Sequence, residues 1–310
     1  MSRASLTERF TLETTLPVKA PYRLDLTAEA LRRLAANAVD LVAEDGTYRR
    51  MLTDADGSNL IEVQQRDAGT LALKITGAQP ERWVPVVTAM LGTQAELDEW
   101  ESRVQPFPWL AELTEQLRGM HPPRYPTLWE ALAHAIVFQQ ISIHAATAIM
   151  RRTVETMSEP IEHGGVTYYP FFDPSQVLFA PDEPLRAAGL SANKVDHLRT
   201  AAAAVEDGAL SEELLATMDS AEAAERLRTL RGIGPWSASV VLLRGLGRLD
   251  VFPLKDSGVA QSLRALSGDP GLDADALLSA LGPVKGMLYF HLLLGRMRNL
   301  AAAPADSSLT

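Results

Sequence analysis

A short glycine-rich break between two helical patterns constrains this sequence more than any other feature. Apolar residues recur at helical spacing on both sides of the break, where Gly232 and Gly234 flank Ile233. Two glycines around one apolar residue favour a tight hairpin in which the isoleucine is the buried plug. Pro235 suits the first turn of the following helix, because its missing N–H is not needed there. The segment therefore predicts two helices joined by a hairpin.

The start of the second helix in this pattern is a candidate site for an anion. Backbone N–H groups at a helix N-terminus carry partial positive charge and bind phosphate readily. Glycine matters here because the backbone itself must approach the phosphate. We therefore expect Gly232, Ile233 and Gly234, with the neighbouring Arg231, to contact DNA. A turn that only joins two helices is the plainer interpretation of this segment taken alone.

A single carboxylate, Asp256, follows a proline-containing loop at the point where the next helical pattern begins. Its plainest role is an N-cap, which stabilises a helix by about 1 kcal/mol. The alternative role is chemical. Breaking an N-glycosidic bond develops positive charge on the sugar, which a fixed carboxylate stabilises. The same carboxylate can orient or deprotonate the attacking water.

The N-terminal third of the chain, residues 1–104, shows patterns of both strands and helices. Period-two alternation or short apolar runs predict strands at residues 10–16, 60–63 and 71–75. Turn signals rich in Asp and Gly occur at residues 44–46 and 54–57. Thr27 is expected to cap a helix that runs through Leu31 and Leu34. These features predict a small sheet packed with helices.

From residue 105 onward the pattern is helical only. After a proline-rich junction, Thr127 and Glu130 form a capping-box pattern at which a helix should begin. Further helices are expected over residues 142–157, 183–188, 193–207, 211–217, 221–229, 235–246, 257–266, 273–280 and 284–298. Residues 159–176 are expected to be an irregular loop and residues 301–310 a frayed tail. The sequence predicts an α+β fold, with a mixed α/β N-terminal domain over 1–104 and an all-α region over 105–300.

The absence of cysteine excludes several kinds of site at once. Without thiolates there is no disulfide, zinc–thiolate site, cysteine nucleophile or cysteine-held iron–sulfur cluster. The six histidines are scattered and predict no catalytic metal site. No apolar run approaches the roughly 20 residues that a membrane span needs. The first ten residues lack an apolar stretch of signal-peptide length, so we expect a cytoplasmic protein, associated with the nucleoid if it is bacterial.

The formal net charge of −10 argues against a protein that coats nucleic acid nonspecifically, because such a protein would be basic. Local charge can differ, and residues 226–255 contain only one acidic residue, Asp250. The cationic residues of this segment are Arg226, Arg228, Arg231, Arg244, Arg248 and Lys255. We expect them to give a local positive field for DNA, with a solvated helix face as the plainer interpretation.

Four motifs in this sequence occur together in one family of DNA repair enzymes. They are the hairpin at 230–236, the Asp-Val-Phe-Pro-x-x-Asp segment at 250–256, the Gln-Gln-x-Ser turn at 139–142 and the Leu-Arg-x-x-Gly-Leu-Ser stretch that leads to Lys194. In these motifs and their order the chain resembles the helix-hairpin-helix DNA glycosylases over about residues 120–300. It is most similar to their DNA-3-methyladenine glycosylase II group. The resemblance implies two helical subdomains with an active-site cleft between them.

The resemblance also implies roles for individual residues. Asp256 matches the catalytic carboxylate of the family. Trp236 stands where bifunctional relatives place a lysine that forms a Schiff base, so a monofunctional enzyme without lyase activity is expected. Trp236, Val240 and Val284 match positions of the base pocket. Because both valines replace aromatic residues of better-known members, the pocket should stack less strongly on cationic bases.

Gln140 matches the wedge that fills the gap left by an extruded nucleotide. A satisfied polar turn residue is the plainer interpretation of Gln140. In similar proteins the hairpin backbone holds a monovalent cation, which here implies a sodium or potassium ion on the carbonyls of Arg228, Leu230 and Ile233. Such an ion would help bind phosphate, and no cofactor is expected for the chemistry.

The expected function is therefore a monofunctional DNA N-glycosylase of base excision repair. It would act as a monomer on damaged double-stranded DNA, flip out an alkylated purine of the 3-methyladenine type and hydrolyse the glycosidic bond with Asp256. Three alternatives stay open. They are a glycosylase of the same fold for another base such as oxidised guanine or deaminated adenine, a noncatalytic helix-hairpin-helix DNA-binding protein, and a helical scaffold without a nucleic-acid role.

Overall fold

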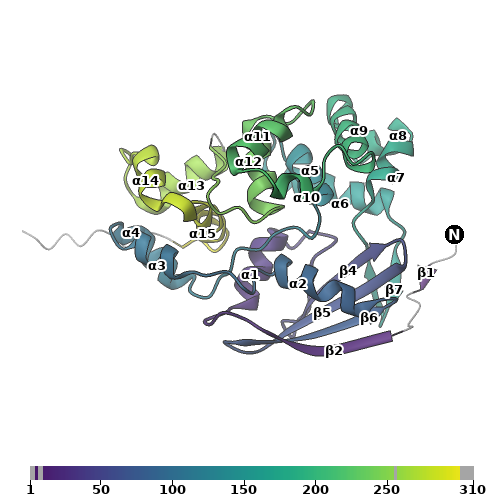
Figure 1. Ribbon diagram of the computed structural model, residues 1–310, viewed down its shortest axis with the longest axis horizontal. Coiled ribbons are helices and arrows are strands. Elements are labelled where there is room, and N and C mark those ends of the chain that lie inside the picture. Colours follow the sequence, from purple (N-terminus) through teal and green to yellow (C-terminus); the bar gives the residue numbers. More distant parts are fainter. Residues whose placement is uncertain (1–3, 6–9, 255–256, 301–310) are drawn as a thin grey trace, which may run out of the picture.

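The computed structural model describes residues 4–5, 10–254 and 257–300, so Asp256 lies outside the described residues. The strands of the N-terminal third lie together on one side of the molecule, and the later helices form the other side (Figure 1). The architecture is α+β, as the sequence predicted.

A five-stranded antiparallel sheet forms most of the N-terminal part, in the order β2-β6-β5-β4-β3. Its strands are β2 (Phe10–Pro17), β3 (Leu41–Val42), β4 (Tyr48–Asp54), β5 (Gly57–Asp67) and β6 (Thr70–Gly77). In strand β6, Ile75 pairs with Ile61 of β5 on one side and with Leu12 of β2 on the other. The three predicted strands are confirmed, and the two predicted turns connect β3 to β4 and β4 to β5.

The first helix, α1 (Leu24–Arg32), begins before the position that the sequence predicted. Leu24 and Leu26 are buried, so the apolar face of the helix already starts at residue 24. Thr27 is therefore not the cap. Its hydroxyl lies within the helix and accepts a hydrogen bond from the backbone N–H of His121 at 3.1 Å. The N-terminal third then contains η1 (Pro80–Trp83), α2 (Val84–Met90) and α3 (Asp98–Val104).

Helices dominate the rest of the chain, and those expected from the sequence are present within a few residues of their predicted bounds. They are α4 (Pro108–Gln116), α5 (Leu128–Val137), α6 (Ile143–Met157), α7 (Pro174–Phe179), α8 (Asp182–Ala187), α9 (Ala192–Glu206), α10 (Glu212–Ala216), α11 (Ser220–Arg228), α12 (Pro235–Arg244), α13 (Ser257–Ser267), α14 (Ala274–Leu281), η2 (Gly282–Val284) and α15 (Gly286–Met297). The sequence did not predict α4 or α7.

The region expected to be all-α contains a small sheet, and the expected irregular loop was wrong. β7 (Ile161–His163) and β8 (Val166–Tyr168) form a hairpin that pairs with β1 (Ala4–Ser5). Gly164 and Gly165 both have positive φ, 57° and 77°, which a two-residue turn between such strands requires. Ile161 and Tyr168 are buried against residues of the larger sheet, so the hairpin is stabilised by distant contacts.

The capping box predicted at the start of α5 is half formed. The Thr127 hydroxyl accepts a hydrogen bond from the Glu130 N–H at 3.1 Å, as expected. The Glu130 carboxylate, however, pairs with the buried guanidinium of Arg50 on β4. Arg50 also pairs with Asp40 at 2.7 Å. This buried triad joins the sheet to α5, because a buried arginine needs charged partners.

The apolar core does not divide at residue 104. Leu26 and Ala30 of α1, with Trp100 of α3, pack in one cluster with residues of α4 and α15. The opposite side of α1 packs with the sheet and with α5. The domain boundary at 104 remains a prediction. Within the described residues no single helix is long and apolar enough to cross a bilayer, and only the sharply bent pair 274–284 and 286–297 passes that test together.

Candidate active site and nucleic-acid interface

A large groove opens between the N-terminal part and the helical part of the molecule. It is bordered by α1, the loop between α5 and α6, the hairpin before α12, and helices α13 and α15. Its volume is about 2040 Å³. Pockets for small ligands are about 300–1,000 Å³, so this groove suits a macromolecular ligand.

The predicted hairpin between α11 and α12 is present on the wall of this groove. Gly232 has a φ of +92°, and the extended Gly234 precedes Pro235 at the first position of α12. Ile233 is 5% exposed, which makes it the buried plug expected from the sequence. The first N–H groups of a helix have no intrahelical acceptor and point outward. The hairpin therefore presents backbone donors to the groove.

The loop between α5 and α6 lies beside the hairpin and lines the same groove. Gln140 is exposed and adopts a φ of +58°, which few residues other than glycine do. Strained backbone of this kind is concentrated at functional sites. The next residue, Ile141, is 38% exposed although it is a large apolar residue. Sequence analysis named Gln140 but missed Ile141, for which the signal was an apolar residue inside a polar turn.

Two side chains hold this loop in place. The Gln139 amide donates to the carbonyl of Gly232 and to the hydroxyl of Ser237, both at 2.7 Å. The Lys194 ammonium donates to the carbonyls of Val137 at 2.7 Å and Gln139 at 3.0 Å. Burial lowers the pKa of Lys194. Lys194 therefore caps the C-terminal end of α5, and Gln139 ties the loop to the hairpin.

The Ser142 hydroxyl accepts a hydrogen bond from the Ala145 N–H at 3.3 Å and so caps α6 on the far side of this loop. Sequence analysis named Ser142 and Lys194 as parts of two family motifs but gave neither residue a structural role. Their partners are main-chain groups that the sequence does not mark.

Only one of the three residues expected in the base pocket lines the groove. Trp236 lines the groove, as predicted. Val240 and Val284 are buried, at 1% and 7% exposure, in the apolar core and do not line it. They point into the core because α12 and η2 bury their apolar faces against neighbouring helices. Phe138 and Tyr289 line the groove in their place, and sequence analysis missed both.

The segment that follows Asp256 borders the same groove. Helix α13 begins at residue 257, and Gly258, Val259, Gln261 and Ser262 line the groove. The hairpin, the loop of Gln140 and the residues next to Asp256 thus meet at one site. Asp256 itself lies outside the described residues, so its role remains a prediction.

The positive charges of the groove come from other segments than expected. The described charged residues that line it are Arg32, Arg33, Arg264, Arg296, Arg298, Asp25 and Glu29. In the predicted basic segment, Arg244 is fully buried, and Arg248 donates to the carbonyl of Met218 at 2.9 Å. Arg244 and Arg248 therefore do not add to the positive field, because they satisfy main-chain and core groups. Lys255 lies outside the described residues. Arg231 is exposed beside the hairpin.

The proposed cation site has oxygen donors of the appropriate kind. The Leu230 carbonyl accepts a hydrogen bond from the Ile233 N–H at 3.1 Å, which leaves its second lone pair for an ion. Arg228 is the last residue of α11 and Leu230 comes two residues later, where carbonyl groups lack intrahelical donors. These donors fit sodium or potassium, and the ion remains a proposal.

Comparison with known proteins shows which family this region resembles. Residues 133–281 match the model of the HhH-GPD superfamily base excision DNA repair protein. This match confirms the resemblance to that superfamily found in the four sequence motifs.

Named relatives specify the resemblance further. A DNA-3-methyladenine glycosylase of Bacillus subtilis is 30% identical over 159 residues, 51% of this chain and 52% of the relative. The putative DNA-3-methyladenine glycosylase YfjP of the same species is 24% identical over 254 residues, 80% of this chain and 85% of the relative. The superfamily members that it resembles are thus of the 3-methyladenine type. The chain spans about half the length of the first curated relatives it matches.

The fold is also shared with a solved structure. The 3-methyladenine DNA-glycosylase from Archaeoglobus fulgidus superposes with a TM-score of 0.78 at 23% identity, over 92% of this chain and 98% of the other. This similarity covers the sheet as well as the helices, so both parts belong to the shared fold.

Proposed function

We propose that this chain is a monofunctional DNA N-glycosylase that removes alkylated purines of the 3-methyladenine type from double-stranded DNA. One observation carries the proposal. A single groove brings together the hairpin before α12, the strained loop at Gln140, the aromatic ring of Trp236 and the residues that follow Asp256. The relatives named for this activity support it.

The groove supports binding of a duplex in which one nucleotide is turned outward. The hairpin N–H groups would hold a phosphate, and the groove arginines would add attraction that falls with salt. Gln140 and Ile141 project from a fixed loop and would fill the space that the extruded nucleotide leaves. A base without its normal pairing costs less to extrude, so damaged bases would be favoured.

Asp256 would supply the chemistry. As the C1′–N bond breaks, both bonding electrons leave with the base and positive charge develops on the sugar, which the carboxylate stabilises. A water oxygen then bonds to C1′ and gives up a proton, with the carboxylate orienting it. A tryptophan at position 236 cannot form a Schiff base with the sugar, so the strand would stay intact at the abasic site. We propose that one chain acts alone.

The test is release of free bases from methylated duplex DNA by wild type and by Asp256→Asn. Wild type should release 3-methyladenine and 7-methylguanine, and the substitution should lower the rate by at least about 100-fold, since it removes the charge that stabilises the transition state. Asp250→Asn is the matched control, because Asp250 is an exposed aspartate of the same loop.

Duplex binding by the Asp256→Asn variant distinguishes loss of chemistry from loss of folding, and it should equal that of wild type. A strand break at the abasic site would contradict the monofunctional mechanism. Wild type that binds duplex DNA but releases no base would show a DNA-binding protein of the same fold. Release by Asp256→Asn at the wild-type rate would refute the assigned carboxylate.

A further inference from the structure

Two carboxylates line the groove that would bind DNA. Asp25 and Glu29 are the acidic side chains among the described residues that border it. Both belong to α1, and both contact Arg298 at the end of α15. A carboxylate repels phosphate, so the two acidic positions bear directly on how a duplex enters the groove.

Glu29 occupies two donors of the Arg298 guanidinium. Its Oε2 atom accepts a hydrogen bond from Nε at 2.8 Å and one from Nη2 at 2.5 Å. Asp25 lies farther from the same guanidinium, at 3.6 Å, and accepts hydrogen bonds from Arg23 at 2.9 and 2.5 Å instead. Asp25 therefore has a cation of its own, whereas Glu29 pairs only with Arg298 in the part of the chain that the structure describes.

The pair of Glu29 and Arg298 is not needed to hold α1 against α15. Leu26 and Ala30 of α1 already pack in the apolar cluster that contains Leu292 of α15. The side chains of Arg298 and Glu29 are 34% and 26% exposed, and ion pairs that water reaches contribute little to stability. The carboxylate can therefore be exchanged for another anion at small cost.

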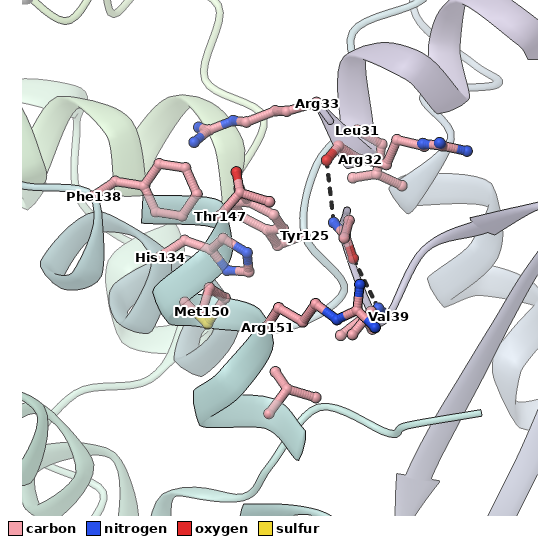
Figure 2. Close-up of a pocket in the computed structure, with 13 residues that line it drawn as sticks. Leu31, Arg32, Arg33, Val39, Tyr125, His134, Phe138, Thr147, Met150 and Arg151 are labelled. Carbon is pink, nitrogen blue, oxygen red and sulfur yellow. Dashed lines mark hydrogen bonds between the residues drawn. The ribbon is translucent and has the colours of Figure 1, made fainter. Parts of the chain in front are cut away.

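The surrounding charges favour a phosphate as that anion. Arg32 in the last turn of α1 and Arg296 in the last turn of α15 line the same groove, and neither has a carboxylate partner among the described residues. The Arg32 side chain extends away from the rings of Tyr125 and His134 (Figure 2). Both helices present carbonyl groups at this end, so side-chain cations and not backbone N–H groups would bind an anion here. A guanidinium suits the role, because it pairs with a phosphate through two parallel hydrogen bonds.

We propose that Arg298 is a DNA phosphate-binding residue and that Glu29 holds its guanidinium until a duplex displaces the carboxylate. The proposal rests on the function proposed above and adds a contact at the ends of α1 and α15, apart from the hairpin before α12. In the exchange the hydrogen bonds from Nε and Nη2 pass from Glu29 to phosphate oxygens, and no covalent bond changes. Glu29 thereby lowers the affinity for duplex DNA, because its carboxylate competes with the phosphate for Arg298.

The experiment maps the contact phosphate by phosphate. Each duplex carries one tetrahydrofuran abasic-site analogue, which fixes the register of the protein, and one phosphate replaced by an uncharged methylphosphonate. Fluorescence anisotropy gives the dissociation constant of each duplex for wild type and for Arg298→Gln. One or two adjacent replacements should weaken binding by wild type about 5-fold and binding by Arg298→Gln by less than about 2-fold, because the variant has already lost the contact.

Glu29→Gln tests the competition. It removes the competing charge and should tighten binding of the unmodified duplex about 3-fold, while the same phosphates stay sensitive to replacement. Adding Arg298→Gln to Glu29→Gln should abolish that sensitivity. If Arg298→Gln does not fold, Arg298→Lys replaces it, and loss of the planar donor pair should reduce the sensitivity at least about 2-fold.

The matched control is the exposed pair of Arg118 and Glu115, which does not line the groove. Arg118→Gln and Glu115→Gln change the net charge by the same amounts as the test variants. They should leave both the affinity and the phosphate map as in wild type. An equal gain in Glu115→Gln and Glu29→Gln would show an effect of net charge alone and overturn the proposal.

The remaining outcomes separate this proposal from the proposed function. A map in which no phosphate depends on Arg298, or a Glu29→Gln variant that binds no more tightly than wild type, would overturn the exchange. Base release from methylated DNA would then still support the glycosylase function, which does not require this contact. A wild type that binds no duplex would overturn both proposals.

Discussion

At the scale of single residues, the hairpin depends on the absence of a side chain at Gly232. The residue has a φ of +92°, and a Cβ atom there would lie 2.2 Å from the ring of His197 on α9. The His197 ring lines the groove next to the hairpin. Gly232 is thus required both by its backbone conformation and by close packing against another helix.

Gly232→Ala should therefore destabilise the protein and weaken duplex binding. The positive φ alone costs about 1–2 kcal/mol for a residue with a Cβ, and the contact with His197 adds to that. Urea unfolding and fluorescence anisotropy with a duplex measure the two effects.

Gly208→Ala is the control for the cost of the positive φ, because Gly208 has a φ of +73° and open space around it. It should show the conformational cost alone and bind duplex normally. Adding His197→Ala to Gly232→Ala should recover part of the stability. Equal stabilities of the two glycine variants would show that the His197 contact is unimportant.

At the scale of elements, hydrogen bonds join the loop of Gln140 to the hairpin. The Gln139 amide spans from the end of α5 to the carbonyl of Gly232 and the hydroxyl of Ser237. Lys194 of α9 fixes the other side of the same loop. A phosphate bound at the hairpin would therefore set the position of Gln140 relative to the duplex.

Gln139→Ala should slow base release mainly where a base must be extruded from an intact pair. Each lost hydrogen bond contributes about 0.5–1.5 kcal/mol, so we expect a rate about 10-fold lower on a fully paired duplex. The same lesion opposite an abasic gap needs less help and should be affected less. Single-turnover release from both duplexes measures the difference.

The control for that prediction is Gln116→Ala, since Gln116 is an exposed glutamine on α4 that bonds only within its own helix. It should leave both rates unchanged. An equal loss on the two duplexes would mean that Gln139 supports the fold and not the position of the loop.

At the scale of the whole molecule, three buried histidines link stability to pH. Burial lowers the pKa of His121, lowers that of His134 well below its usual range, and lowers that of His291 to about 4. The unfolded chain binds protons at these rings near pH 6.5, whereas the folded chain does not. Their contribution to stability is complete above pH 6.5 and is lost as the pH falls from there toward the folded pKa values.

The free energy of unfolding should therefore fall between pH 7 and pH 5, with a share of about 2 kcal/mol from His291. His291→Gln keeps a donor for the Met287 carbonyl but does not titrate, so that share should disappear. Urea unfolding at the two pH values measures it. The exposed His144 provides the control, and His144→Gln should retain the wild-type pH dependence. Identical pH dependence in His291→Gln would refute the assignment.

Local sequence signals determined much of the fold and part of the site. The hairpin follows from two glycines around Ile233, and the strands of the larger sheet follow from alternation of apolar residues, because both depend on neighbours in the chain. Trp236 and Gln140 were instead named from the resemblance to the glycosylase family. The catalytic role of Asp256 remains a prediction, because Asp256 lies outside the described residues.

Tertiary structure decided what depends on distant partners. The turn at Gly164 becomes a strand hairpin only because Ile161 and Tyr168 find the larger sheet. The Glu130 carboxylate pairs with the distant Arg50 and not with the backbone of its own helix cap. Arg33 lies in the groove wall, where Phe138 and Tyr289 contact its guanidinium. Sequence periodicity shows which face of an element is buried, but it does not show which element covers that face. The family resemblance placed Val240 and Val284 in the base pocket, and the fold placed them in the core, where neighbouring helices cover them.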